Sequence, residues 1–218
     1  MGRDIELKRL LSEAIGTFFL VFAGTGAIVV DDISHGQITH LGVAMTFGLV
    51  VMILIYAFGG ISGAHFNPVV TLGFWLSQRF ETKRVLPYLG SQFLGGVAAS
   101  GLVYVLFPNN QTLGATLPIG SSIQSFVLEV VLTLLLVLVI LNVTSGSKEE
   151  GLLAGVAIGG TVGLEALFAG PICGASMNPV RSFAPALISG QMSGIWIYLL
   201  GPLLGSCFAV VVHRVLKP

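Results

Sequence analysis

The sequence has little charge. Only 9% of its 218 residues are Asp, Glu, Lys or Arg, whereas a soluble domain carries roughly 25%. So few charged side chains cannot cover the surface of a soluble fold. With 54% hydrophobic residues and a mean hydropathy of +0.94, the composition indicates an integral membrane protein. The formal net charge is +0, so nothing in the composition suggests a nucleic-acid partner.

Residue clusters that carry enzyme chemistry are also missing. The two cysteines, Cys173 and Cys207, form neither a metal-binding spacing nor a disulfide framework. There is no phosphate-binding loop and no nucleophile paired with a base. We therefore expect no enzyme activity, no cofactor, no metal and no catalytic residue.

The sequence contains long apolar runs. A membrane span needs about 20 apolar residues, and six runs reach that length, at roughly 10–30, 40–59, 86–107, 123–143, 152–169 and 194–212. Two shorter pieces, at roughly 67–77 and 178–188, are about half a span each, and both begin at Asn-Pro. The first run continues to Val30, so we interpret it as a span and not as a cleavable signal peptide.

The basic residues predict the orientation. With six spans, nine of the ten Lys and Arg residues fall on one side: Arg3, Lys8, Arg9, Arg79, Lys83, Arg84, Lys148, Arg214 and Lys217. This side is cytoplasmic by the positive-inside rule. We therefore expect a multi-pass protein of the cell membrane with both termini cytoplasmic. Each short piece must enter and leave on one side, the first from the cytoplasm and the second from outside, so both are re-entrant.

The chain repeats itself in order. The matching pairs are Glu13-Ala-Ile-Gly-Thr17 with Glu129-Val-Val-Leu-Thr133, Gly42-Val-Ala with Gly155-Val-Ala, and the Tyr88 to Gly95 segment with the Tyr198 to Gly205 segment. We interpret residues 1–218 as one domain with internal repeats at about 9–107 and 122–214. Each half has three spans, so the halves insert with opposite orientation. Such an inverted repeat places a site near the membrane midplane.

Two Asn-Pro boxes, "NPV" in both halves, start the short pieces: Asn67, Pro68 and Val69, then Asn178, Pro179 and Val180. Asn is a good helix N-cap and Pro is favoured at the first helical position. A helix can start at mid-membrane only where its backbone is buried or lines a watery cavity. We expect the two starts to meet head to head. There the positive helix ends disfavour cations, and the Asn amides orient a passing water so that a proton wire is broken.

The two boxes, Arg181 after the second, Glu13 and Glu129 opening the halves, and the six-span repeat resemble the aquaporin (major intrinsic protein) family. The motif style is similar to the nodulin-26-like branch and its bacterial relatives. The resemblance covers essentially the whole chain. It implies an all-α membrane protein with six transmembrane helices and two re-entrant half-helices, and a homotetramer in membrane lipid with one pore per subunit. Val69 and Val180 depart from the Ala that usually ends the box, which is expected to shift packing or pore width.

The resemblance also implies a constriction outside the Asn pair, at Phe47, Ala166, Ala175 and Arg181. A cation near the membrane centre marks a pathway; the alternative for Arg181 is pairing with lipid phosphate or with Asp31 or Asp32. Water-selective members carry His at the position of Ala166. Two alanines therefore predict a wider channel for water and small neutral solutes such as glycerol, urea, boric acid or arsenous acid. A strictly water-selective channel is the alternative.

Glu13 and Glu129 are predicted to be buried. Their structural role would be to accept hydrogen bonds from the non-helical backbone before each box. The alternative is proton coupling in a secondary transporter, and a third possibility is a structural membrane protein with a closed pore. His65 is expected either to line the cytoplasmic vestibule or to pack as a hydrogen-bonded side chain.

Overall fold

The computed structural model describes residues 2–145 and 148–216, in which eight helices are formed. They are α1 (Gly2–Ile33), α2 (Thr39–Ser62), α3 (Pro68–Leu76), α4 (Thr82–Leu106), α5 (Ser122–Val143), α6 (Lys148–Cys173), α7 (Pro179–Ser189) and α8 (Ile195–Leu216). Six of them are long and apolar enough to cross a membrane. The six predicted spans and the two short helices are confirmed. Lys217 lies outside the described residues.

Helix ends differ from the apolar runs. Helix α1 begins at Gly2, well before the apolar run, and α6 continues to Cys173. Hydropathy marks the part of a helix that lipid requires to be apolar. The backbone hydrogen bonds continue beyond that part, into segments where polar side chains meet water.

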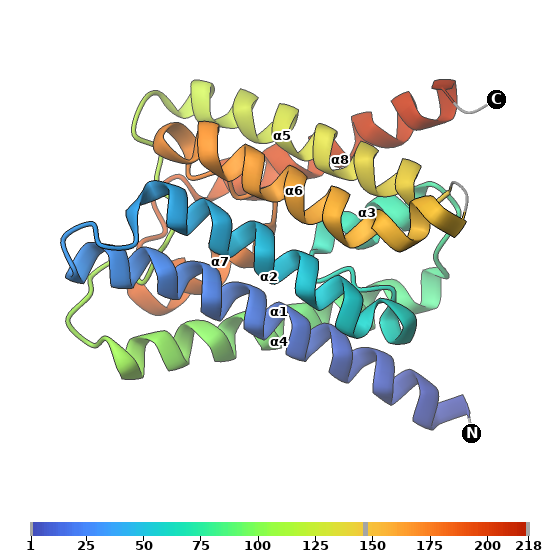
Figure 1. The fold of residues 1–218 in the computed structure, drawn as a ribbon, viewed down its shortest axis with the longest axis horizontal. Coiled ribbons are helices and arrows are strands. Elements are labelled where there is room, and N and C mark those ends of the chain that lie inside the picture. Colours follow the sequence, from blue (N-terminus) through green and yellow to red (C-terminus); the bar gives the residue numbers. More distant parts are fainter. Residues whose placement is uncertain (1, 146–147, 217–218) are drawn as a thin grey trace.

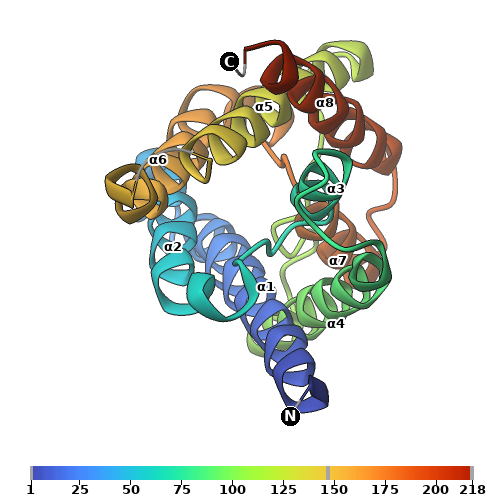
Figure 2. The same cartoon turned by 90° about the vertical axis from the view of Figure 1, so that its right-hand side faces the viewer.

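The long helices form a ring around the short ones. Along the ring α1 contacts α2, α2 contacts α6, α6 contacts α5 and α5 contacts α8, while α4 closes onto α1. Helices α3 and α7 fill the side between α8 and α4 (Figure 2). Figure 1 shows α3 near the end that holds both termini and α7 toward the other end. The two half-helices therefore enter from opposite ends and start toward the middle.

Glycines allow the helices of each half to approach closely. A methyl group on Gly95 would collide with the carbonyl oxygen of Ala14 in α1, and one on Gly205 would collide with that of Val130 in α5. Small residues have this role in membrane helix packing, where backbones come into contact. The same device thus joins α1 to α4 and α5 to α8, while α3 and α7 fill the side between α4 and α8.

Candidate functional site

The Asn-Pro boxes start α3 and α7 as the sequence predicts. Asn67 precedes α3, and its Oδ1 accepts a hydrogen bond from the backbone N of Val69 over 3.1 Å. Asn178 precedes α7, and its Oδ1 accepts from the backbone N of Val180 over 3.0 Å. In both helices the proline takes the first position, where no N–H is needed.

The two boxes are tied to each other across the centre. Asn67 Nδ2 donates to the carbonyl oxygen of Met177 over 2.8 Å, and Asn178 Nδ2 donates to that of Phe66 over 2.9 Å. An amide nitrogen carries two hydrogens. Each Asn thus uses one N–H to join the halves and keeps the other for the cavity that both Asn residues line.

The backbone before each box is strained. Four residues other than glycine lie in the left-handed region: Ala64 (φ 52°), Phe66 (φ 48°), Ala175 (φ 40°) and Met177 (φ 52°). Each such residue costs of order 1–3 kcal/mol and needs support from its surroundings. This conformation turns the carbonyls of Phe66 and Met177 toward the opposite Asn and turns N–H groups toward a buried carboxylate.

Glu13 supports the first strained segment and is fully buried. Its Oε1 accepts from Ser62 Oγ (2.7 Å) and from His65 N (3.0 Å). Its Oε2 accepts from Phe66 N (2.8 Å) and from Gln92 Nε2 (2.8 Å). Both oxygens are therefore occupied by donors from three parts of the chain.

Glu129 supports the second segment in the same way. It is fully buried, with Oε1 accepting from Ser176 N over 2.7 Å and Oε2 from Met177 N over 2.8 Å. Each half therefore carries one carboxylate that fixes the loop before its own box.

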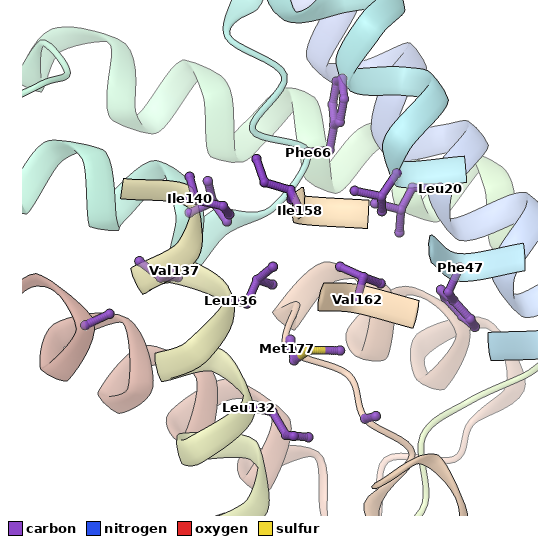
Figure 3. Packing of buried hydrophobic residues seen from close by; sticks show 14 of the residues in the cluster. Leu20, Phe47, Phe66, Leu132, Leu136, Val137, Ile140, Ile158, Val162 and Met177 are labelled. Carbon is purple, nitrogen blue, oxygen red and sulfur yellow. The ribbon is translucent and has the colours of Figure 1, made fainter. Parts of the chain in front are cut away.

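A narrow cavity of about 100 Å³ runs along the boxes. One water occupies roughly 10–15 Å³ by this measure, so the cavity has room for several waters in a row. One wall is apolar, and Figure 3 shows Leu136, Ile140, Ile158 and Val162 directed into the same space from α5 and α6. The facing wall carries Asn67, Asn178 and the loops before them.

A second, larger cavity of about 330 Å³ is lined by residues from the end of α1, the start of α2 and the loop before α5. These segments lie at the end away from the termini (Figure 1). Four residues line both this outer cavity and the inner one: Phe47, Ala166, Ala175 and Arg181. They stand at the junction of the two cavities. The structure thus brings together the four residues that the sequence places at a constriction.

Arg181 is held from several sides and is only 2% exposed. Its Nη1 donates to the carbonyl oxygen of Gly114 over 2.9 Å, and its guanidinium carbon lies 4.9 Å from the ring centroid of Phe47. Its Nε has no hydrogen-bond partner among the described residues. Asp31 and Asp32 accept hydrogen bonds elsewhere, from Thr39 N and Asn110 Nδ2. Arg181 is thus fixed at the junction, where it lines both cavities.

The two valines of the boxes do not line either cavity. Val180 packs over Gly96 of α4, where a methyl group on the glycine would collide with Val180 Cγ1. Val69 is 1% exposed, and its carbonyl oxygen accepts from Ser206 Oγ over 2.8 Å. Gly96 thus makes room for the side chain of Val180.

His65 lies just before the first box and is buried. It lines the inner cavity. Its Nδ1 also lies 3.0 Å from Thr71 Oγ1, and its ring stacks on Phe74 with centroids 4.7 Å apart.

Arg79 lies at the end of α5, next to a residue that lines the inner cavity. Its guanidinium donates to the carbonyl oxygens of Leu141 (3.1 Å) and Thr144 (2.7 Å), at the end of α5. Thr144 itself lines the cavity. Partial burial lowers the pKa of Arg79. The side chain thus caps the last carbonyls of α5 beside the inner cavity.

The sequence reasoning missed two polar residues within the spans. Gln92 bonds Glu13 and Thr71, and Glu165 of α6 is fully buried with no partner for either carboxylate oxygen among the described residues. Polar residues inside apolar runs are a signal that could have found both. The carbonyl of Gly114 has no such signal, because its position depends on the loop before α5. Within the described ranges, no three His, Cys, Asp or Glu side chains form a metal-binding group.

Comparisons with known proteins agree with this geometry. The model of the family described as "Major intrinsic protein" matches residues 3–213. The chain belongs to the major intrinsic protein family. Among the family's curated members, it is 43% identical over 212 residues to "Aquaporin NIP1-1" of Oryza sativa subsp. japonica, covering 97% of this chain and 75% of that one. It is 42% identical to "Nodulin-26" of Glycine max, with 97% and 78% covered.

A solved structure extends the family likeness to the fold. The "X-ray structure of the aquaglyceroporin from Plasmodium falciparum" matches with a TM-score of 0.83 and 25% identity, covering 97% of this chain and 96% of that one. Membership of this family makes the chain a multi-pass membrane channel and not an enzyme.

Proposed function

We propose that this chain is a passive channel for water and small uncharged solutes such as glycerol, urea, boric acid or arsenous acid, and that it excludes protons and ions. The observation that carries this proposal is the junction of the two cavities. There one cation, one aromatic ring and two methyl groups meet. Such a pore offers donors to a hydroxyl oxygen on one side and an apolar surface to a carbon skeleton on the other.

Phe47, Ala166, Ala175 and Arg181 form the selectivity filter in this proposal. Ala166 and Ala175 leave space that a larger side chain would fill, which favours a pore wider than a strictly water-selective one. Arg181 repels cations and donates to passing oxygens. At the Asn pair, the free N–H of Asn67 and of Asn178 binds the oxygen of a passing water, and the N-termini of α3 and α7 add positive potential. Both effects oppose proton transfer.

Glu13 and Glu129 serve as structural carboxylates in this reading. Their oxygens face loop N–H groups, and neither residue lines the inner or the outer cavity. A proton site of a secondary transporter would need contact with the pathway. These contacts favour a channel over the proton-coupled alternative.

Orientation and assembly are part of the same proposal. Both termini lie at one end (Figure 1), as does the pairing of Arg84 with Glu6, with Arg84 Nε 3.2 Å from the carboxylate. This end is proposed to be cytoplasmic in a cell membrane. Large apolar side chains cover the outside of the ring, such as Leu86, Leu94 and Ile123. They suit contact with lipid and with other copies in a homotetramer.

The test uses purified protein in liposomes and stopped-flow light scattering under water and glycerol gradients. The wild type is expected to shrink fast and then to take up glycerol fast, relative to empty vesicles. Ala166→His should slow glycerol while water stays fast, because the larger ring narrows the junction. Arg181→Val should let cations leak, since it removes the charge that repels them. Fast water flux without glycerol entry in the wild type would favour the strictly water-selective alternative.

A further inference from the structure

One carbonyl of α6 lacks its helical donor. In an α-helix the carbonyl of a residue accepts from the N–H four positions later. For Leu167 that position is Pro171, which lies inside α6 and has no N–H. The structure fills this gap from another helix: His40 Nε2 lies 2.6 Å from the carbonyl oxygen of Leu167. A carbonyl only accepts, so His40 carries its hydrogen on Nε2 and donates it.

The backbone before His40 is shaped for this contact. Thr39, the first residue of α2, has φ 65°, an outlier for a β-branched residue. The conformation is held on both sides, because Asp31 Oδ1 accepts from Thr39 N over 2.8 Å and Thr39 Oγ1 accepts from Gly42 N over 3.3 Å. Such strain persists only where the surroundings enforce it. Here it places the imidazole of an exposed residue against α6.

The contact is next to the filter. Leu167 follows Ala166 directly, and His40 lines the same outer cavity as Ala166 and Arg181. The ring also packs on the α6 backbone, because a methyl group on Gly170 would lie 3.0 Å from His40 Cε1. The α6 turn that carries Ala166 is therefore fixed by a side chain from the start of α2.

We propose that His40 is a positioning residue that sets the size limit of the filter. It does so by donating to the Leu167 carbonyl, which Pro171 leaves without its helical hydrogen bond. By holding the Leu167 carbonyl, it keeps Ala166 at its distance from Arg181. This inference rests on the proposed function, since it assigns His40 to the filter of that pore. Loss of the hydrogen bond releases the turn and widens the junction, so a larger solute gains more than water does.

The test compares three substitutions by the ratio of glycerol to water permeability in proteoliposomes. Gln places its Nε2 where the His Nε2 stands, whereas Asn is too short and Ala has no donor. His40→Gln should keep the wild-type ratio, and His40→Asn and His40→Ala should raise it by about twofold, the effect of one modest hydrogen bond. Pro171→Ala supplies the missing helical N–H. In that background His40→Ala should no longer change the ratio.

Two results would overturn the proposal: an unchanged ratio in His40→Ala and His40→Asn, or a His40→Gln variant that behaves like His40→Ala. If His40 served only stability, all three variants would have a lower thermal midpoint and an unchanged ratio of glycerol to water permeability. That result would also contradict the proposal. Absence of flux in the wild type would instead refute the proposed channel function. The two failures are therefore distinguishable.

Discussion

The two halves hold their Asn-Pro boxes with unequal sets of partners. In the first half, Glu13 accepts from Ser62 and Gln92 in addition to two backbone N–H groups. Aligned on the repeat, Cys173 stands at the place of Ser62 and Pro202 at the place of Gln92. Glu129 accepts from the backbone N–H groups of Ser176 and Met177, and the thiol of Cys173 is a third, weaker partner.

The second half also differs in a buried carboxyl group. Glu165 occupies the place that Leu54 has in the first half, and both are buried. In the first half, both carboxylate oxygens of Glu13 are therefore hydrogen-bonded. An apolar residue, Leu54, stands where the second half has Glu165. The second has fewer side-chain donors and an additional carboxyl without a partner among the described residues. The comparison teaches that the two backbone bonds are the shared requirement, while the strong side-chain donors, Ser62 and Gln92, are an addition of the first half.

The largest effect is expected when a carboxylate becomes an amide. In Glu13→Gln, one oxygen that accepts two bonds becomes an NH₂ group, so two buried donors lose their acceptor, at a cost of about 4 kcal/mol. In Glu129→Gln only one donor is lost, and we expect about 2 kcal/mol. Thermal unfolding of both variants in detergent checks the order. Equal losses would show that the side-chain bonds to Glu13 add nothing.

A helix contact that both halves share should give the next largest effect. Gly95→Ala pushes a methyl group against the Ala14 carbonyl, and Gly205→Ala does the same at Val130. We expect each to cost about 3 kcal/mol by overpacking. The control is Gly90→Ala, which meets nothing within 4 Å and should be neutral or stabilising by up to about 1 kcal/mol. If all three variants unfold at the same temperature, close backbone approach does not limit stability.

A change of opposite sign is expected at Glu165. Glu165→Leu makes the second half resemble the first and removes a buried polar group that has no partner among the described residues. We expect a gain of about 2 kcal/mol in stability, with unchanged water flux, because Glu165 lines neither the inner nor the outer cavity. The matched change, Leu54→Glu, should be strongly destabilising. Lower stability of Glu165→Leu would mean that the carboxyl has a favourable role in the second half.

The smallest effect is expected at Gln92. Gln92→Leu removes a donor from Glu13 and from Thr71. It also removes the Gln92 Oε1 atom, which has no partner among the described residues, so the net cost should be only about 1 kcal/mol. The thermal midpoint of Gln92→Leu should lie between those of the wild type and Glu13→Gln. A midpoint below that of Glu13→Gln would contradict this ranking of the contacts.

Much of this architecture could be predicted from the residues. Hydropathy located the spans, and the chemistry of Asn and Pro located the starts of α3 and α7, because both signals are local. Contacts between distant loops were out of reach. The bond from Asn67 to the Met177 carbonyl depends on left-handed residues whose φ angles are set by Glu129, and the bond from Arg181 to Gly114 depends on the loop that connects the two halves. Hydropathy likewise gives no signal for the ends of helices that extend beyond the membrane into water.

The central claim, that one chain forms a passive pore that breaks a proton wire, is tested most directly by measuring water and proton flux together. Proteoliposomes containing a pH-sensitive dye would be shrunk osmotically in a stopped-flow instrument and then exposed to a pH step. The account predicts shrinkage far faster than in empty vesicles, with dye kinetics the same as in empty vesicles. Shrinkage no faster than the empty control, or a pH gradient that collapses as water flows, would contradict it.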